Sequence, residues 1–560
     1  MHEALDCKNL KRLPLSIRFT ANSAVSANRK IEDLERLQAY SVTASATQCL
    51  LLLPVVYINL DTADIPDPGV FDAEPTHALV AAIYASATGR AVVALDILCT
   101  IQLPPEAEGL GADLWPRVLA WAQWIDNNGH YLADTPFCLS ILSFADVADQ
   151  NLEMSKLITS EPWIWSMVGR AWAHLPGLTN THDRLATVGR LQYFLSHDGL
   201  GEPQSFAEVL DGLGGTLSEL GRLTVHLFDE LVPAAHQPMD MPYLGYLNSA
   251  FLLVGNVELA LSDGGSKDRE ESCSGFRKSL LSHQFVRVLL RAMCSLSNTR
   301  SEATLFLLRR CFKRMNILLM TPVGFTSLPA ALDDGLLRVV VLCALSPFAH
   351  DLQEQFEKYL VHWFPPCLHN YSFVSALDAA LHGTADLVNT DAFKSSEIRR
   401  AWDTFLNIAR SSLEILRVFD ARPASSVLKA CDNLECLKID AKITFKRCSG
   451  CRSCYYCSRA CQTSDWQNGH RLVCDSYGTL TLSERNVNSF TTRQRSFLRT
   501  LVDTAYARNR RAIFMQHATS IKNEHTTFVV YDYSAGAVKI RFKSTIGLPQ
   551  LDGPEWEDLM

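Results

Sequence analysis

The residues of this sequence that could do chemistry are concentrated in one short segment. The chain has seventeen cysteines, of which nine are scattered from Cys7 to Cys367 and eight lie between Cys431 and Cys474. The dense segment reads CDNLECLKIDAKITFKRCSGCRSCYYCSRACQTSDWQNGHRLVC and contains one histidine, His470. Thiolates and imidazole nitrogens are the ligands that Zn2+ prefers in proteins. The segment therefore predicts a metal centre.

The spacing within this segment indicates two closed zinc sites. Eight ligand-type residues form four pairs: Cys431 with Cys436, Cys448 with Cys451, Cys457 with Cys461, and His470 with Cys474. Two residues between two cysteines allow a tight turn to direct both sulfurs at one metal, and three residues place two ligands on one face of a helical turn. Eight ligands complete two tetrahedral sites with no position left for water or substrate. The zinc would then be structural, and its binding energy would serve folding.

A disulfide framework or a set of unrelated buried cysteines is the alternative explanation for this cluster. Disulfides form in oxidising compartments. Residues Met1 to Pro14 have charges scattered among apolar residues and lack the apolar run of a signal peptide. We therefore expect an intracellular protein, in the nucleus or the cytoplasm, whose scattered cysteines are reduced and buried thiols.

The segment resembles the MYND family of zinc fingers. That family's pattern ends in Tyr-Cys, three residues, Cys-Gln, a Trp four residues after the Gln, and then His and Cys. The matching residues here are Tyr456, Cys457, Cys461, Gln462, Trp466, His470 and Cys474. The resemblance implies that the four pairs interleave. One zinc would then be bound by Cys431, Cys436, Cys457 and Cys461, and the other by Cys448, Cys451, His470 and Cys474.

The first pair departs from the commonest family spacing. Four residues, Asp432 to Glu435, separate Cys431 from Cys436, where two are usual in the family. Zinc-binding turns accept two to four residues between ligands, so the departure concerns the local geometry of the turn. Cys454 is a ninth thiol at a position where the family has a non-ligand, and we expect it to be a bystander.

The resemblance also implies a peptide-binding groove. MYND domains commonly capture short proline-containing peptides beside the second zinc, and the groove positions correspond to Ser449, Gln462 and Trp466. Each has an alternative explanation. Trp466 could be a core residue of a small domain, while Ser449 and Gln462 could be solvated polar side chains.

The segments before the finger are predicted to be helical. The 560-residue chain is 48% hydrophobic and 20% charged, with a formal charge of -8, which is typical of a globular protein and gives no reason to expect nucleic-acid binding from the whole chain. From about residue 29 to 420 the apolar residues recur at helical spacing, with loops expected at 61–76, 232–243 and 262–275. Residues 1–425 therefore form an all-helical region in a mainly α protein. An armadillo-like solenoid and a compact bundle both fit this pattern.

The region after the finger, 475–560, is predicted to be a short α+β tail. A helix is expected from Thr491 to Tyr506, followed by a hairpin of the strands Phe528–Tyr533 and Ala537–Phe542. The apolar runs Cys49–Leu60 and His77–Leu103 are either too short or interrupted by charges for membrane spans. We interpret both runs as buried helices and expect no membrane association.

Catalysis is the main rival function. Some MYND fingers interrupt a SET-domain protein lysine methyltransferase, but neither a Gly-rich cofactor loop before the finger nor an Asn-His-Ser-Cys segment after it is present. Gly212, Gly214 and Gly215 lack the third glycine of a dinucleotide-binding loop and are expected to break a helix. Two basic stretches, around residues 309–314 and 493–511, are expected to be solvated helix faces. The sequence thus predicts a non-enzymatic protein.

We therefore expect a zinc-binding protein that uses the finger for protein–protein interaction, with a role in transcriptional regulation as one expectation. The partners would be proteins or proline-containing peptides. An enzyme with its site in the helical region, and nucleic-acid binding through the basic tail, remain as alternatives. The layout resembles fungal MYND-finger proteins with long helical N-terminal regions. The partner, the pathway and the oligomeric state do not follow from the sequence.

Overall fold

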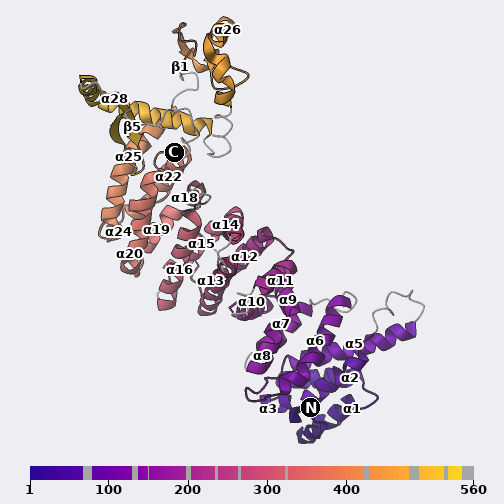
Figure 1. Cartoon of the computed structure of the whole chain (residues 1–560). Coiled ribbons are helices and arrows are strands. Elements are labelled where there is room, and N and C mark those ends of the chain that lie inside the picture. Colours follow the sequence, from indigo (N-terminus) through magenta and orange to yellow (C-terminus); the bar gives the residue numbers. More distant parts are fainter. Residues whose placement is uncertain are drawn as a thin grey trace. The chain divides into compact units, whose positions relative to one another are not determined.

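A computed structural model describes most of the chain. The described residues are 1–66, 78–128, 137–148, 151–178, 180–196, 203–233, 237–262, 267–299, 301–321, 324, 326–421, 428–478, 491–522 and 527–544. They group into two compact units, Met1–Leu318 and Leu319–Met560. Helices dominate both units (Figure 1). The prediction of a mainly α protein is therefore confirmed, while the choice between a solenoid and a bundle stays a prediction.

The first unit is built from helices. Its α-helices are α1 (Leu15–Ala24), α2 (Ile31–Thr43), α3 (Ala46–Leu50), α4 (Leu53–Asn59), α5 (Ala78–Leu98), α6 (Leu110–Asn128), α7 (Phe137–Ala148), α8 (Leu152–Thr159), α9 (Pro162–His174), α10 (Thr181–Ser196), α11 (Pro203–Gly212), α12 (Leu217–Leu231), α13 (Met241–Ser262), α14 (Lys267–Ser282), α15 (Phe285–Ser297) and α16, which begins at Glu302 and ends at Leu319. Helices α9 and α11 cross at glycines, because a Cβ atom on Gly169 or Gly212 would overlap the backbone of the facing helix. Gly212 also ends α11, and Gly214 and Gly215 follow it with positive φ angles. The expected helix break is therefore confirmed.

One predicted loop is wrong. Residues 262–275 were expected to be irregular because glycine, serine and charges cluster there, yet α14 begins at Lys267. Acidic residues at the start of a helix interact favourably with its dipole, and Asp268, Glu270 and Glu271 occupy that position. The composition of a helix N-terminus was therefore mistaken for that of a loop. Residues 263–266 lie outside the described part of the chain.

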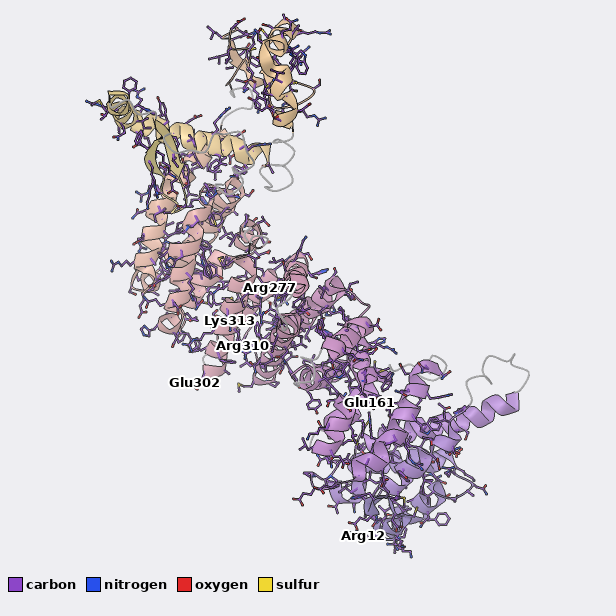
Figure 2. All side chains as sticks on the ribbon, in the orientation of Figure 1. Arg12, Glu161, Arg277, Glu302, Arg310 and Lys313 are labelled. Carbon is purple, nitrogen blue, oxygen red and sulfur yellow. The ribbon has the colours of Figure 1, made fainter. Side chains whose placement is uncertain are left out.

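The basic stretch on α16 is only partly a solvated face. Arg314 pairs with the buried carboxylate of Glu258 on α13, and Arg277 on α14 donates a hydrogen bond of 3.0 Å to the other oxygen of that carboxylate. The guanidinium of Arg310 lies 4.6 Å from the centroid of the Phe306 ring. Figure 2 labels Arg277, Arg310 and Lys313. Arg314 thus neutralises a buried charge, since an unpaired carboxylate there would be costly.

Helix α13 raises the question of a membrane span. Among the described residues it is the one helix long enough and apolar enough to cross a membrane by length and composition. Half of its apolar window is buried inside the unit, where the helix packs against α10, α12 and α14. Core helices of helical proteins have the same composition, so this property is weak evidence for a span.

The described residues of the second unit form further helices and three small antiparallel strand pairs. Its helices are α18 (Leu328–Asp333), α19 (Leu336–Ala344), α20 (Ala349–Glu357), α21 (Phe364–Cys367), α22 (Tyr371–Gly383), α23 (Ala385–Val388), α24 (Asp391–Lys394), α25 (Arg399–Ala421), α26 (Arg459–Asp465) and α28 (Thr492–Lys522). The pairs are β1 (Leu428–Ala430) with β2 (Ile439–Ala441), β3 (Lys446–Arg447) with β4 (Tyr455–Tyr456), and β5 (Thr527–Asp532) with β6 (Lys539–Ser544).

The expected α+β tail is present but its helix is longer than predicted. The first half of α28 buries Phe497 and Leu501 against α22 and α25, as the apolar pattern indicated. Gln494 fixes the start of the helix by donating to the carbonyl of His369 at 2.9 Å. After Tyr506 the apolar pattern fades, yet the helix continues to Lys522. A hairpin follows, and each of its strands is shifted by one or two residues from the prediction.

Candidate metal centre

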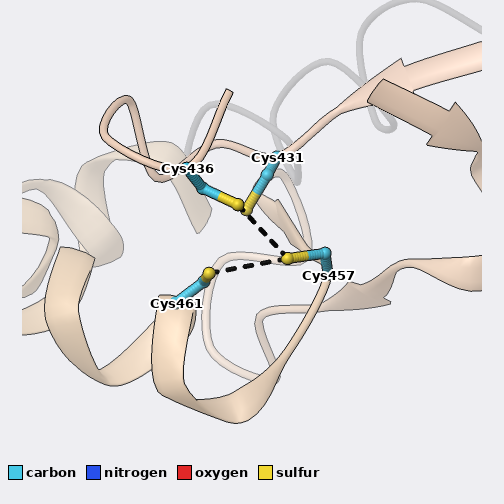
Figure 3. A group of neighbouring side chains, drawn as sticks. All are labelled: Cys431, Cys436, Cys457 and Cys461. Carbon is cyan, nitrogen blue, oxygen red and sulfur yellow. Dashed lines mark hydrogen bonds between the residues drawn. The ribbon is translucent and has the colours of Figure 1, made fainter. Parts of the chain in front are cut away.

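The first group of ligand-type side chains comes from four separate points of the finger. Cys431 follows β1, Cys457 follows β4, and Cys461 lies in the first turn of α26. With Cys436 they form a group whose sulfur atoms all lie within 4.8 Å of one another (Figure 3). The Sγ of Cys457 is 3.4 Å from that of Cys436 and 3.5 Å from that of Cys461. The first and third pairs of the sequence pattern, Cys431 with Cys436 and Cys457 with Cys461, therefore come together.

The four-residue spacing of the first pair is accommodated by a compact turn. The amide of Cys436 donates to the carbonyl of Asn433 at 3.0 Å, and the Asn433 side chain accepts a hydrogen bond from the amide of Glu435 at 3.1 Å. The amide of Cys431 donates to the carbonyl of Lys438 at 2.8 Å, which closes the loop. Leu437 supplies the reversal with a φ of 51°. The longer loop thus still directs both sulfurs to one point.

The second group is buried. Cys448 follows β3, Cys451 completes the turn after it, and His470 ends the π-helical segment η11 (Trp466–His470). The Nε2 atom of His470 lies 3.4 Å from the Sγ of Cys448 and 3.7 Å from that of Cys451, and the Sγ atoms of Cys448 and Cys474 are 3.8 Å apart. These four side chains form the second group within 4.8 Å. Gly450 leaves room for it, because a Cβ there would lie 2.8 Å from the Sγ of Cys474.

Both groups fit structural zinc. Four sulfurs around Zn2+ at about 2.3 Å are about 3.8 Å apart in a tetrahedron. The observed sulfur separations of 3.4 to 3.8 Å are close to that value. The donor sets, four cysteines in one group and three cysteines with one histidine in the other, are those of closed zinc sites. Two structural zinc ions therefore account for both groups.

The environment of Cys461 favours the thiolate that a metal requires. A hydrogen bond from the side chain of Ser458, together with contacts to Cys457 and Cys436, lowers the pKa of Cys461 to about 7, while hydrogen bonds with Cys436 and Cys461 raise the pKa of Cys457 to about 12. Ser458 is also the N-cap of α26 and accepts a hydrogen bond from the amide of Cys461. One residue therefore caps the helix and stabilises the ligand in its metal-binding form.

Cys454 belongs to neither group, as expected, but it contacts a ligand. Its Sγ lies 3.6 Å from Nδ1 of His470, on the side of the ring opposite Nε2. A histidine that binds metal through Nε2 keeps its proton on Nδ1, and the acceptor of that proton fixes the orientation of the ring. Cys454 is therefore placed to orient His470. The sequence contained no signal for this contact.

Replacing Cys454 by alanine is expected to leave two zinc ions bound and to weaken the second site about tenfold, the lower end of the effects of losing such a partner. Competition with a chromogenic chelator would measure the release of each ion. Cys7→Ala, which removes an exposed thiol outside the finger, is the control. Release of both ions at the wild-type rate from Cys454→Ala would show that the contact has no role.

The three residues predicted to bind peptide lie in the part of the finger that begins with the second ligand pair. Ser449 is exposed, Gln462 on α26 is half-buried, and Trp466 is 43% exposed with its ring centroid 5.7 Å from that of His470. The fully buried aromatic residue of the finger is instead Tyr456, whose hydroxyl donates to Asp465 at 2.6 Å. Trp466 thus lies at the surface beside a zinc ligand.

The sequence reasoning missed a set of exposed aliphatic side chains in the first half of the finger. They are at least 65% exposed and belong to the long first turn and the strand and turn that follow it: Leu434, Leu437, Ile439 and Ile443. Their signal was present in the sequence, because a small domain whose zinc replaces a core has no interior for four aliphatic residues.

Comparison with known proteins supports the geometry. The model of the MYND finger family matches residues 431–474. Ubiquitin carboxyl-terminal hydrolase 19 of Arabidopsis thaliana is 52% identical over 46 residues, which are 8% of this chain and 7% of that protein. The chain therefore matches less than a tenth of the length of this relative. No solved structure matches the chain. The interleaved ligand groups and the family match together identify residues 431–474 as a MYND finger, a zinc-binding protein-interaction module.

Proposed function

We propose that this protein binds partner proteins through the MYND finger by holding a proline-containing peptide beside the second zinc, on Ser449, Gln462 and Trp466. The observation that carries the proposal is the exposed indole of Trp466 next to the ligand His470. A rigid aromatic face suits the ring of proline, and an exposed tryptophan at a rigid site is typical of a binding hot spot. The zinc ions hold that face in place but take no part in the contact.

The exposed aliphatic residues of the first half add to the proposal. Leu434 and Leu437 are 85% and 83% exposed and lie on either side of the ligand Cys436. A metal-stapled turn presents such side chains at little entropic cost, because the backbone is already ordered. We propose that they contact the partner outside the peptide groove and so increase specificity.

We further propose that the protein is a non-catalytic adaptor. It would act in the nucleus or the cytoplasm, with transcriptional regulation as one proposed role. The relative found by comparison is a hydrolase, but the similarity is confined to the finger and carries no activity to this chain. Burial raises the pKa of Cys99 and of Cys367 to about 12, which is the opposite of what a cysteine nucleophile needs. The raised pKa values favour a structural role for these two cysteines in the helical region.

A peptide-binding experiment tests the proposal. A panel of ten-residue peptides that each contain two prolines would be titrated against the full-length protein by fluorescence anisotropy. We expect at least one peptide to bind, and its affinity to fall about tenfold or more when both prolines are replaced by alanine. Equal affinity for the proline and alanine versions of every binding peptide would refute recognition of proline.

A further inference from the structure

A pocket in the second unit lies away from the residues of the finger. It has a volume of about 490 Å³, which is within the range of small-molecule sites. Residues from three places in the sequence line it: one face of α25, the middle of α28, and the turn between β5 and β6. No part of the proposed function uses these residues.

The pocket is built on a fixed frame. Helix α28 packs on α25 and on β5. The hairpin turn is held by Asp532, which accepts hydrogen bonds from the amide and hydroxyl of Ser534 at 2.9 and 2.6 Å. Gly536, with a φ of 80°, lies so close to α21 that a Cβ would be 2.7 Å from the carbonyl oxygen of Pro365. Only glycine allows this approach, so the hairpin turn is anchored where it forms one wall.

The lining combines an apolar wall with hydrogen-bond donors. Aliphatic side chains come from all three elements: Ile408 and Ile415 from α25, Leu501 from α28, and Val538 from the hairpin. On the polar side, Asn407 accepts a hydrogen bond from Arg410 at 3.1 Å through its carbonyl oxygen, which leaves its amide N–H groups as donors. A ligand would therefore need a short apolar portion and at least one hydrogen-bond acceptor.

The positive charge of the pocket lining favours a negatively charged hydrogen-bond acceptor in the ligand. Arg508 is the only charged residue among the described residues that line the pocket, and none of them is acidic. Its guanidinium donates to the hydroxyl of Ser411 at 2.8 Å and lies 3.9 Å from Glu414, in an ion pair whose side chains are more than half exposed. An exposed pair at that distance is weak, and a guanidinium has five N–H donors, so Arg508 can still bind an anion.

We propose that this pocket binds a carboxylate carried on a short branched apolar stem, with Arg508 pairing with the carboxylate and the aliphatic wall covering the stem. A free small carboxylic acid and the C-terminal residue of a peptide both have this chemistry. A carboxylate fits the forked donors of arginine in two parallel hydrogen bonds, which a neutral amide cannot reproduce. The site would give the second unit a ligand-binding pocket, formed by α25 and the tail, in addition to the finger.

The test uses the full-length protein and a matched pair of probes, 4-methylpentanoate and 4-methylpentanamide, which share the stem and differ in the head group, a carboxylate in one and a neutral amide in the other. Binding would be measured by ligand-observed NMR titration. We expect the acid to bind about tenfold more tightly than the amide, since a charge-assisted hydrogen bond is worth that much. A second pair, acetyl-Gly-Gly-Leu and its C-terminal amide, assigns the source: binding of the peptide acid supports a peptide C-terminus, and its exclusion supports a free acid.

Three variants locate the binding. Arg508→Met should remove the preference for the acid, and Ala537→Trp, which enlarges an exposed side chain at the pocket wall, should prevent binding of both probes. Arg510→Met is the control, because Arg510 is exposed on the same helix but does not line the pocket. Failure of the wild type to bind the acid, equal binding of acid and amide, or unchanged binding by Arg508→Met would each overturn the proposal. Thermal unfolding of each variant would confirm that it is folded.

Discussion

Replacing Trp466 by alanine is expected to lower the affinity of the protein for a proline-containing peptide about thirtyfold or more, the loss typical of a tryptophan hot spot. The zinc content should remain that of the wild type. The indole is 43% exposed and contacts the ring of His470 only at its edge, so its removal takes away binding surface and no metal ligand. Fluorescence anisotropy would give the affinity and elemental analysis the zinc content.

A control for this variant is a second exposed aromatic residue near the same ligand. Tyr477 is also 43% exposed, and its ring centroid is 6.3 Å from that of His470, but it follows the last ligand and has no counterpart among the groove positions. Tyr477→Ala should bind peptide as the wild type does. Equal binding by wild type and Trp466→Ala would remove Trp466 from the groove, and loss of zinc from Trp466→Ala would make it a structural residue.

Replacing Cys457 by alanine should have the largest effect on folding of the finger. Cys457 has close sulfur contacts with Cys436 and with Cys461, so three ligands lose their metal when it is removed. Structural zinc contributes on the order of 10 kcal/mol to folding of a small finger, which exceeds what its few buried residues supply. We expect zinc to fall to one ion or fewer per chain and finger-dependent partners to be lost.

The helical content of Cys457→Ala should change little, because the helices of the first unit contain none of the ligands. Circular dichroism would measure the helical content, and affinity capture from cell extract followed by mass spectrometry would identify the partners that disappear. Cys7→Ala, which removes an exposed thiol outside the finger, is the control. Partners that persist on Cys457→Ala must bind elsewhere, and persistence of all of them would contradict a role of the finger in protein binding.

The helices were predictable because their signal is local. The predicted run in α25, with Trp402, Phe405, Ile408, Leu413 and Leu416, repeats at helical spacing, and all of these residues except the half-buried Ile408 are buried. Boundaries were less predictable where local signals conflict. The second half of α28 continues through Arg510 and Arg511, where charged residues interrupt the apolar pattern before Ile513, which is again buried.

The metal centre was predictable because zinc ligands come in pairs whose spacing is set by the geometry of short turns. The interleaving of the pairs followed from the family resemblance, and the structure gathers the same eight residues into the same two groups. Contacts between distant segments were not predictable. Cys454 reaches His470 across 16 residues, and the pocket joins Ser411 to Arg508 across 97 residues. The spacing of residue types along one sequence does not show which distant loops are in contact in the folded protein.

The measurement that tests the central claim most directly is the metal content of the purified full-length protein, determined by elemental mass spectrometry together with a count of free thiols. Two zinc ions per chain are expected, with the finger's cysteines protected from thiol reagents until a strong chelator is added. Metal-free protein whose finger remains folded with its cysteines reduced would contradict the assignment of residues 431–474.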